Sequence, residues 1–329
     1  MKILKIIKVL GKHCHVFLKI NYLKLVNGNR FFIHYDPIYI GDQIYDGLET
    51  SYLPIYIDLN DKGLSRELAI NHVHEAQSTD FLKTILKKDM IALDVGSNIG
   101  YFALLEARYV GNKGKVFAIE PSPRNSELLE TSLQWSLFTN IKQYTNAIGS
   151  HNGIIDFIEA PQFNRSCVKE LFDGQANSIK VKMVSIDSFV KTHRIKKLDL
   201  IRMDIEGYEW NALQGMKQTL KKLKPKWLFI EVHPLTLKEN NLKFYKLLKQ
   251  EGYIVKKAFF ETDNMGIKGY WVKKLLQKMI ANPLKAVSLF SNEVGGLKSD
   301  GVFDSFKALQ ESPQFSSKSA HCFFKRVKK

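Results

Sequence analysis

The sequence is poor in cysteine, with three among 329 residues, and no segment approaches the roughly 20 apolar residues that a membrane span needs. Cys14, Cys167 and Cys322 lie far apart without C-x-x-C spacing, which argues against a disulfide framework or a zinc site and fits a reducing cytosol. Lysines interrupt the first twelve residues too regularly for a signal-peptide core. We therefore expect a cytoplasmic protein without a bound metal.

Acidic residues are also scarce, because 33 Asp and Glu face 49 Lys and Arg and leave a net charge of +16. Such an excess favours anionic partners, although the solvated surface of a lysine-rich protein is an equal alternative. A helix over residues 1–12 would gather four lysines on one side: Lys2, Lys5, Lys8 and Lys12. That helix could contact an anionic membrane peripherally, and packing on its own domain is the alternative reading.

Internal repeats are absent, and from Met90 onward short apolar runs alternate with helical stretches, which predicts a parallel α/β sheet. The predicted strands are 90–95, 115–120, 141–148, 198–204, 227–232, 253–261 and 320–327, with a hairpin at 153–159 and 180–185. The predicted helices are 99–110, 124–138, 186–193, 208–223 and 237–251. We predict an N-terminal α+β subdomain over 1–85 and a main domain over 86–329, with an insertion at about 262–318 before the last strand.

A glycine turn follows the first strand of the main domain, in the segment IALDVGSNIGYF from Ile91 to Phe102. Its glycines are spaced G-x-x-x-G, whereas a dinucleotide fold would need G-x-G-x-x-G for a pyrophosphate. The carboxylate of Asp94, just ahead of the turn, suits a ligand that carries an ammonium group and no phosphate. S-adenosylmethionine has this chemistry, and its predicted contacts in the turn are Asp94, Gly96, Ser97, Asn98 and Gly100.

Acidic and polar residues also end the next two strands. Glu120 closes the second strand, 26 positions after Asp94, where a carboxylate can accept both ribose hydroxyls of a nucleoside. Asn146 and Ala147 end the third strand and would lie beside the adenine. The ordered combination of turn and strand ends predicts a site for S-adenosylmethionine.

The fourth and fifth strands end in ionisable groups, within IRMDIEGYEWNAL and FIEVHP. Because these ends adjoin the first strand in a doubly wound sheet, Asp204, Glu206, Glu231 and His233 should converge on one crevice. Methyl transfer to a hydroxyl needs a proton acceptor, and His233 is the first candidate, with Asp204 or Glu206 second. The alternatives are a packing role for His233 and carboxylates that hold Mg²⁺.

One further histidine pair, His72 and His74, lies next to Glu75 in the segment NHVHEA. Alternating histidines can bind a metal, but a second motif with matching spacing is missing. We therefore expect this segment to make a helix-surface or subdomain contact.

These motifs resemble those of the FkbM family of methyltransferases. The resemblance runs from about Asp80 to Tyr253 and rests on LDVGSNIGYFALLEARYVGNKGKVFAIEPSPRN, TNAIG, VSIDSF, LIRMDIEGYEWNALQGM and FIEVHP. It implies a Rossmann-like, seven-stranded methyltransferase sheet, S-adenosylmethionine as the methyl donor, and a hydroxyl acceptor that is often on a sugar, a glycan or a glycolipid.

Two other functions remain as alternatives. An RNA or DNA methyltransferase would share the fold and explain the positive charge, but the acidic fourth strand end is unfavourable for phosphate, so nucleic acid is the less favoured partner. A nucleotide-binding oxidoreductase or epimerase of sugar metabolism would need the phosphate-binding turn that is missing here.

Overall fold

The computed structural model describes residues 20–21, 24–35, 53–136, 138–172, 174, 176–260, 302–303 and 319–327. The basic segment 1–12 and nearly all of the predicted insertion at 262–318 lie outside the described residues. No helix within the described ranges has the length and apolar character needed to span a membrane.

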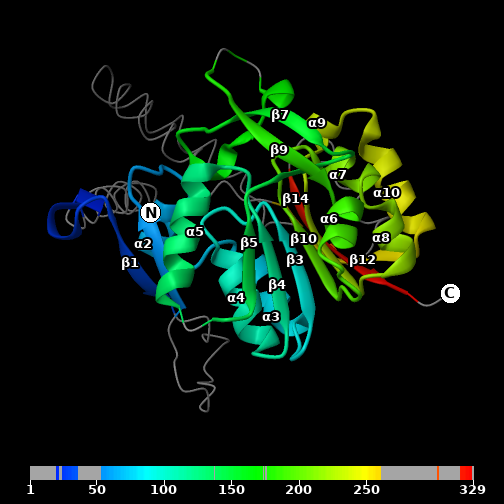
Figure 1. The fold of residues 1–329 in the computed structure, drawn as a ribbon, viewed down its shortest axis with the longest axis horizontal. Helices are drawn as coiled ribbons and strands as arrows, with labels where there is room; N and C mark the ends of the chain where they lie inside the picture. The colour runs from blue at the N-terminus through cyan, green and yellow to red at the C-terminus, as the bar shows by residue number, and fades with distance from the viewer. Residues whose placement is uncertain are drawn as a thin grey trace, which may run out of the picture.

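The core of the molecule is a mixed sheet in the order β13-β12-β14-β11-β10-β3-β4-β5 (Figure 1). Its strands are β3 (Ile91–Val95), β4 (Lys115–Ile119), β5 (Ile141–Tyr144), β10 (Leu200–Met203), β11 (Trp227–Val232), β12 (Tyr253–Phe260), β13 (Val302–Phe303) and β14 (Ala320–Arg326). Strands β5, β4, β3, β10 and β11 run parallel, and β14 is antiparallel to both β11 and β12. The seven predicted strands of a Rossmann-like methyltransferase sheet are thus present, and the predicted last strand lies inside the sheet.

Helices cover both faces of this sheet. One layer consists of α3 (Ala76–Ile85), α4 (Tyr101–Val110) and α5 (Pro123–Trp135), and the other of α6 (Ile186–Thr192), α7 (Glu209–Gln214), α8 (Lys217–Lys222) and α10 (Asn240–Gln250) (Figure 1). The strands between them are buried on both faces, which explains their continuous apolar runs. Because the parallel strands share one direction, their carboxyl ends meet at one edge of the sheet.

A second, smaller sheet follows β5 and corrects the prediction of one strand over 141–148. The chain leaves the main sheet after Tyr144 and resumes as β6 (Ala147–Gly149) in the order β6-β9-β7-β8. The other members are β7 (Gly153–Ile158), β8 (Cys167–Val168) and β9 (Ile179–Ser185). Strands β7 and β9 pair antiparallel, as the predicted hairpin requires. The bend at Asn146 places that residue at the junction between the two sheets.

The predicted helix over 208–223 is also wrong as a single element, because it is divided between α7 and α8. The break falls at Gly215, where an added Cβ would collide with the carbonyl oxygen of Gly149 in β6. The close approach of β6 therefore requires a glycine there. Similarly, the predicted helix over 237–251 begins earlier, with the short α9 (Pro234–Leu237), and restarts as α10.

The described part of the N-terminal segment packs directly on the main domain. Strands β1 (Arg30–Tyr35) and β2 (Leu53–Asp58) form a hairpin, and α2 (Leu64–Asn71) and α3 follow it. Buried side chains of β2, such as Leu53 and Ile55, belong to the same hydrophobic cluster as those of α4 and α5. In addition, the hydroxyl of Ser132 in α5 accepts a hydrogen bond of 2.8 Å from the Tyr56 amide. The division into domains at residue 85 stays a prediction, because one apolar core continues across it.

Candidate active site

The turn after β3 is held tightly against its two neighbouring strands. The amides of Gly96 and Ser97 both donate to the carbonyl oxygen of Ile119 in β4, at 2.9 and 3.1 Å. Gly96 has φ +76°, and a Cβ there would collide with the carbonyl oxygen of Asp204. Gly100, with φ +94°, precedes the first turn of α4. The glycine spacing recognised in the sequence therefore lets the turn pass close to the end of β10.

Glu120 is buried at the end of β4 and organises the turn from the other side. Its carboxylate accepts hydrogen bonds from the amides of Asn98 at 2.8 Å and Ser122 at 2.9 Å. Burial raises the pKa of Glu120 to about 7, although these hydrogen bonds oppose the shift. Oε1 also accepts a hydrogen bond of 3.4 Å from the side-chain amide of Asn125, whereas Oε2 accepts the Asn98 amide and keeps a second lone pair for a further donor. Glu120 can therefore hold the turn and also accept a ligand hydroxyl.

A cleft lies between this turn and the second sheet. Five of the predicted cofactor residues line it: Gly96, Asn98, Glu120, Asn146 and Ala147. Its remaining lining is largely apolar and includes Val95, Ile148, Phe157 and Val168. Three carboxylates border it, and none of its lining residues in the described part of the chain is Lys or Arg. These carboxylates can accept hydrogen bonds from the ribose hydroxyls and the ammonium group of a nucleoside ligand. The described lining offers no cationic side chain to a pyrophosphate.

The other three predicted cofactor residues do not line the cleft, and their roles stay predictions. Ser97 borders the adjoining cavity described below, and its hydroxyl donates to the Asp94 carbonyl oxygen at 3.3 Å. Gly100 packs against the Leu129 side chain of α5, so its predicted role would be through the backbone of the turn. Asp94 is fully buried, and its carboxylate pairs with Arg202 at 3.0 Å. Asp94 therefore acts on a cavity only through that arginine.

Arg202 is a site residue that the sequence analysis did not single out. Its guanidinium contacts Asp94 at 3.0 Å and Asp204 at 3.1 Å, and it lies over the ring of Phe102, 4.1 Å from the centroid. Burial would lower the pKa of Arg202, but Asp94 and Asp204 raise it well above its ordinary value. An arginine inside an apolar strand is the signal that could have identified it, because a buried charge needs partners.

A larger cavity of about 300 Å³ adjoins the cleft and shares Gly96, Asn98, Asp204 and Glu206 with it. As predicted from the ends of the fourth and fifth strands, the structure brings Asp204, Glu206, Glu231 and His233 to this cavity. His233 Nε2 lies 3.6 Å from Glu206 Oε2 and 3.4 Å from Glu231 Oε1. The catalytic assignment of these residues remains a prediction, because proximity alone does not show a role.

The charges around this cavity perturb one another strongly. Burial and the neighbouring carboxylates raise the pKa of Asp204 and of Glu206 well above the ordinary range, while His233 opposes the shift at both. Burial alone would also raise the pKa of Glu231, but His321 and His233 lower it to about 2. A carboxyl group with a raised pKa can accept a proton near neutral pH, so the cavity has the chemistry of proton transfer.

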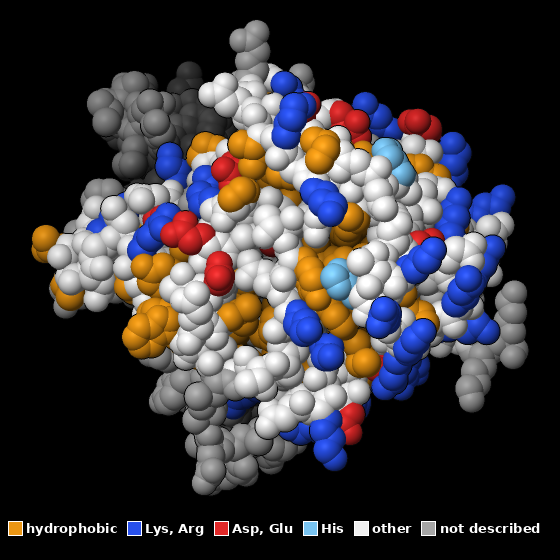
Figure 2. Space-filling model, viewed as in Figure 1, with side chains coloured by type: hydrophobic (Ala, Val, Ile, Leu, Met, Phe, Trp, Pro, Cys, Tyr) orange, Lys and Arg blue, Asp and Glu red, His pale blue; other side chains and the backbone are white. Residues whose placement is uncertain are grey.

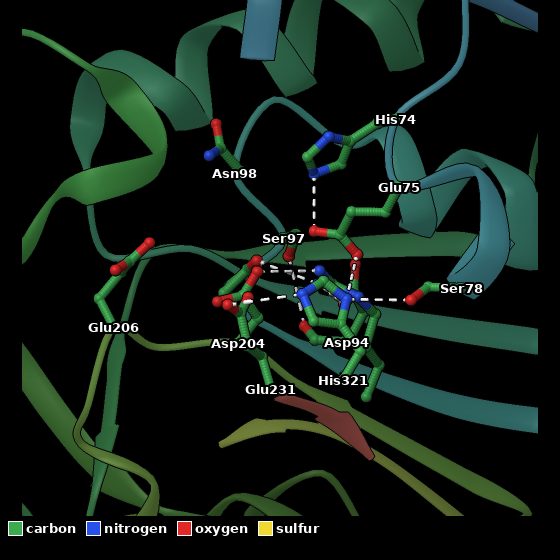
Figure 3. A network of polar contacts seen from close by, with 12 residues as sticks. His74, Glu75, Ser78, Asp94, Ser97, Asn98, Asp204, Glu206, Glu231 and His321 are labelled. Atoms are coloured by element: carbon green, nitrogen blue, oxygen red, sulfur yellow. Dashed lines mark hydrogen bonds and ion pairs between the residues drawn. The ribbon is translucent and has the colours of Figure 1, made fainter. Parts of the chain in front are cut away.

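Four more residues extend this cluster toward the N-terminal segment, and the sequence analysis did not place them there. Glu75 Oε2 lies 2.9 Å from His321 Nδ1, and Glu75 Oε1 lies 3.0 Å from His74 Nε2 (Figure 3). Ser78 also contacts His321 Nδ1 at 2.9 Å. The expectation that His74 and Glu75 make a subdomain contact thus misses that Glu75 borders the larger cavity. No local motif signals this, because His321 lies about 240 residues away.

Residues 94–255 match the family model of the methyltransferase FkbM domain. This part of the chain is an FkbM methyltransferase domain. Hexuronic acid methyltransferase AglP of Haloferax volcanii is 28% identical over 157 residues, which cover 47% of this chain and 62% of AglP. The 2-O-methyltransferase NoeI of Sinorhizobium fredii is 27% identical over 182 residues, which cover 49% of this chain and 71% of NoeI.

Among solved structures, methyltransferase FkbM from Methylobacillus flagellatus is similar at 20% identity and a TM-score of 0.38, over 55% of this chain and 43% of that one. The match to AglP spans less than two thirds of that protein's length. S-adenosylmethionine is the cofactor of this FkbM domain. The cleft fits it, since Glu120 can accept ribose hydroxyls and the lining residues that the structure describes include no Lys or Arg that would favour phosphate.

Proposed function

We propose that this protein is an S-adenosylmethionine-dependent O-methyltransferase that acts on a hydroxyl of a sugar, a glycan, a glycolipid or a related metabolite. The observation that carries the proposal is the continuity of the two cavities, because Asp204 and Glu206 border both the cofactor cleft and the acidic cavity. An acceptor in the larger cavity would lie beside the cofactor. The names of AglP and NoeI, a hexuronic acid methyltransferase and a 2-O-methyltransferase, support a sugar hydroxyl as the acceptor.

When bound, S-adenosylmethionine supplies an electrophilic methyl group. This chain's own residues must position the acceptor oxygen in line with that group and exclude water. The turn at Gly96 and the end of β10 at Asp204 lie in contact, so the cofactor cleft and the acceptor cavity are fixed relative to each other. Their separation is therefore set by the sheet and does not depend on a flexible loop.

The proton of the acceptor hydroxyl must pass to a group in the cavity, either His233 or a neighbouring carboxylate. The buried Glu209 carboxylate holds His233 Nδ1 at 3.0 Å, so that His233 Nε2 faces Glu206 and Glu231. A proton placed on Nε2 would be stabilised by those carboxylates. Asp204 and Glu206 are the other candidates, since their raised pKa values suit proton acceptance.

The proposal is tested by incubating the purified full chain with S-adenosylmethionine labelled in its methyl group and with glucuronic-acid oligosaccharides and neutral glycans as acceptors. We expect methyl ethers on a sugar hydroxyl. His233→Ala should lose about 10²–10⁴-fold in turnover while retaining cofactor binding. The exposed His151→Ala is the matched control and should keep full turnover. Normal turnover of His233→Ala would remove this residue from the mechanism, and transfer to RNA alone would overturn the proposed acceptor class.

We also propose a cytoplasmic location with peripheral membrane contact through the basic segment 1–12. The support is the sequence itself, namely cysteines without disulfide spacing and lysines on one side of the segment. Fractionation of cells that express the full chain and a variant with Lys2, Lys5, Lys8 and Lys12 changed to glutamate would test it. Loss of membrane association in the variant alone is the expected result, and equal association of both chains would contradict the proposal.

A further inference from the structure

The acidic cavity carries the donor set of a cation site. Asp204, Glu206 and His233 each offer one ligand atom, and these atoms lie within 4.8 Å of one another. All three residues line the larger cavity. Two neighbouring ligands on an ion with bonds of about 2.1 Å lie about 3–3.5 Å apart. The 3.6 Å between His233 Nε2 and Glu206 Oε2 is close to that spacing.

The orientation of His233 favours a ligand role. Its Nδ1 lies 3.0 Å from Glu209 Oε1, and Glu209 is fully buried and also accepts a hydrogen bond from the Gly207 amide. A carboxylate at one ring nitrogen fixes the tautomer in which the other nitrogen presents a lone pair. His233 Nε2 therefore presents that lone pair toward Glu206 and Glu231. This arrangement of carboxylate, histidine and open cavity is typical of metal-binding histidines.

Glu231 adjoins the cluster, and its positive partners are the imidazoles of His233 and His321 when these rings are protonated. Its side chain is 8% exposed and lines the cavity, yet its nearest donors are ring nitrogens of His233 and His321 at 3.4 and 3.5 Å. Both distances exceed a normal hydrogen bond. His321 Nε2 is itself buried without a hydrogen-bond partner among the described residues. In Figure 3 the carboxylates of Glu231 and Asp204 lie close together. A buried carboxylate in this setting requires a nearby positive charge.

The permanent charges around the cavity leave a negative surplus. Four carboxylates line it, from Glu75, Asp204, Glu206 and Glu231, against the guanidinium groups of Arg165 and Arg202. The imidazoles of His74 and His233 also line it and add positive charge only when they are protonated. Arg202 also neutralises Asp94, which lies outside the cavity lining, and Arg165 is exposed to solvent. A divalent cation would compensate this surplus at the point where Asp204, Glu206 and Glu231 approach one another.

We propose that this cluster binds one divalent cation, with His233 Nε2 and the carboxylates of Asp204 and Glu206 as ligands and Glu231 as the adjoining carboxylate. The consequence for catalysis rests on the proposed function. A hydroxyl coordinated to a divalent cation loses its proton more readily than a free one, and the cation also orients it. His233 then acts as a ligand, and the proton of the acceptor passes to another base beside the cavity.

The test uses the full chain, freed of metal with a chelator and titrated with Mn²⁺ while the electron paramagnetic resonance signal of free Mn²⁺ is recorded. We expect one Mn²⁺ per chain. Glu206→Gln and His233→Gln should each weaken binding at least about tenfold, and Glu209→Gln should weaken it about 10–100-fold by releasing the histidine. Glu127→Gln, which changes an exposed carboxylate on α5, is the matched control and should bind like the wild type.

Circular dichroism and thermal unfolding of each variant, measured on the same samples, show that the fold is intact, and cofactor binding is measured on the wild-type chain. A wild-type chain that binds no Mn²⁺, or Glu206→Gln and His233→Gln chains that bind it as tightly as the control, would overturn the proposed cation site. Full methyl transfer in excess chelator would likewise overturn its catalytic role and leave the proposed function standing. Failure of cofactor binding with normal Mn²⁺ binding would contradict the proposed function alone.

Discussion

Arg202 links the buried Asp94 of β3 to Asp204 in the acidic cavity. It lies in β10, 4% exposed, and its two terminal nitrogens pair with Asp94 and Asp204. The pairing removes three charged groups from water, and the guanidinium also packs on Phe102. Breaking such a buried pair leaves a carboxylate without compensation, which costs more than the pair itself contributes.

Arg202→Met should therefore destabilise the protein by about 3–5 kcal/mol, because Asp94 would stay buried and without its cation. Urea unfolding followed by circular dichroism measures this free energy. The exposed Arg165→Met tests the same exchange beside the cavity and should change stability by less than about 0.5 kcal/mol. Equal, small effects of both changes would show that the buried pair does not stabilise the site.

The ionisation of Glu120 should control cofactor affinity near neutral pH. Burial raises the pKa of this carboxyl to about 7, and a ribose hydroxyl donates more favourably to the charged form. Because the charged form is populated only above that pKa, affinity for S-adenosylhomocysteine should be about tenfold weaker at pH 6 than at pH 8. Calorimetric titration at both pH values measures the difference.

Glu120→Gln should weaken binding at pH 8 and lose most of this pH dependence. The exposed Glu130→Gln should keep both the affinity and the pH dependence of the wild type. The raised pKa also affects folding. The free energy of unfolding should fall as the pH rises from about 4.5 to 7, because Glu120 releases its proton in the unfolded chain over this range and keeps it in the folded chain. A Glu120→Gln chain with an unchanged pH profile of binding would contradict the ribose assignment.

The residues that the sequence identified and those that it missed differ in how far apart their partners lie. Glu120 and Asn98 could be predicted because a short segment that ends in a glycine turn or a strand tip constrains them locally. Arg202 could have been found from its place in an apolar strand. His321 and Glu75 could not, since their contact joins positions separated by most of the chain and depends on β14 entering the sheet beside β11.

At the scale of elements, the departures from prediction occur where the second sheet meets the main domain. Apolar periodicity predicts one strand over 141–148 and one helix over 208–223, and both are divided in the structure. The two divisions lie against each other. The chain leaves the main sheet after Tyr144, and β6 then passes so close to Gly215, between α7 and α8, that a side chain would not fit there. Periodicity reports which residues are buried, but it does not report which sheet buries them.

Gly215→Ala should consequently destabilise the protein by about 1–3 kcal/mol, because the new methyl group would be forced against the Gly149 carbonyl oxygen. Thermal unfolding measures the loss. Gly153→Ala is the matched control, since Gly153 is exposed and its Cβ would meet only the His151 ring, at 3.9 Å. If Gly215→Ala is as stable as the control, the close approach of β6 does not require a glycine at this position.

At the scale of the whole molecule, the described part of the N-terminal segment forms part of the wall of the larger cavity. Helix α3 begins beside Glu75, and Ser78 on that helix contacts His321 in the last strand of the sheet. Leu64, His74 and Glu75 border the acceptor cavity together with Glu231 and His233. The sequence predicted the order of strands well, because each strand is a local apolar run. It could not show that residues before the methyltransferase core complete the cavity.

The positive charge of the chain lies mainly away from this cavity. Figure 2 shows Lys and Arg side chains gathered on the right of the visible face, where Figure 1 places α8 and α10. Exposed lysines of these helices and their flanks include Lys217, Lys221, Lys222, Lys243, Lys246 and Lys249. The surface is thus basic while the cavity is acidic, so the excess of positive charge predicted from composition does not describe the site.

The central claim is that the cleft between the glycine turn and Glu120 binds S-adenosylmethionine. Calorimetric titration of the purified chain with S-adenosylmethionine, and separately with NADH, tests it most directly. The account predicts saturable one-to-one binding of S-adenosylmethionine and none of NADH, because the cleft lining within the described ranges has three carboxylates and no Lys or Arg. Binding of NADH, or no binding of S-adenosylmethionine or its demethylated product, would contradict the account.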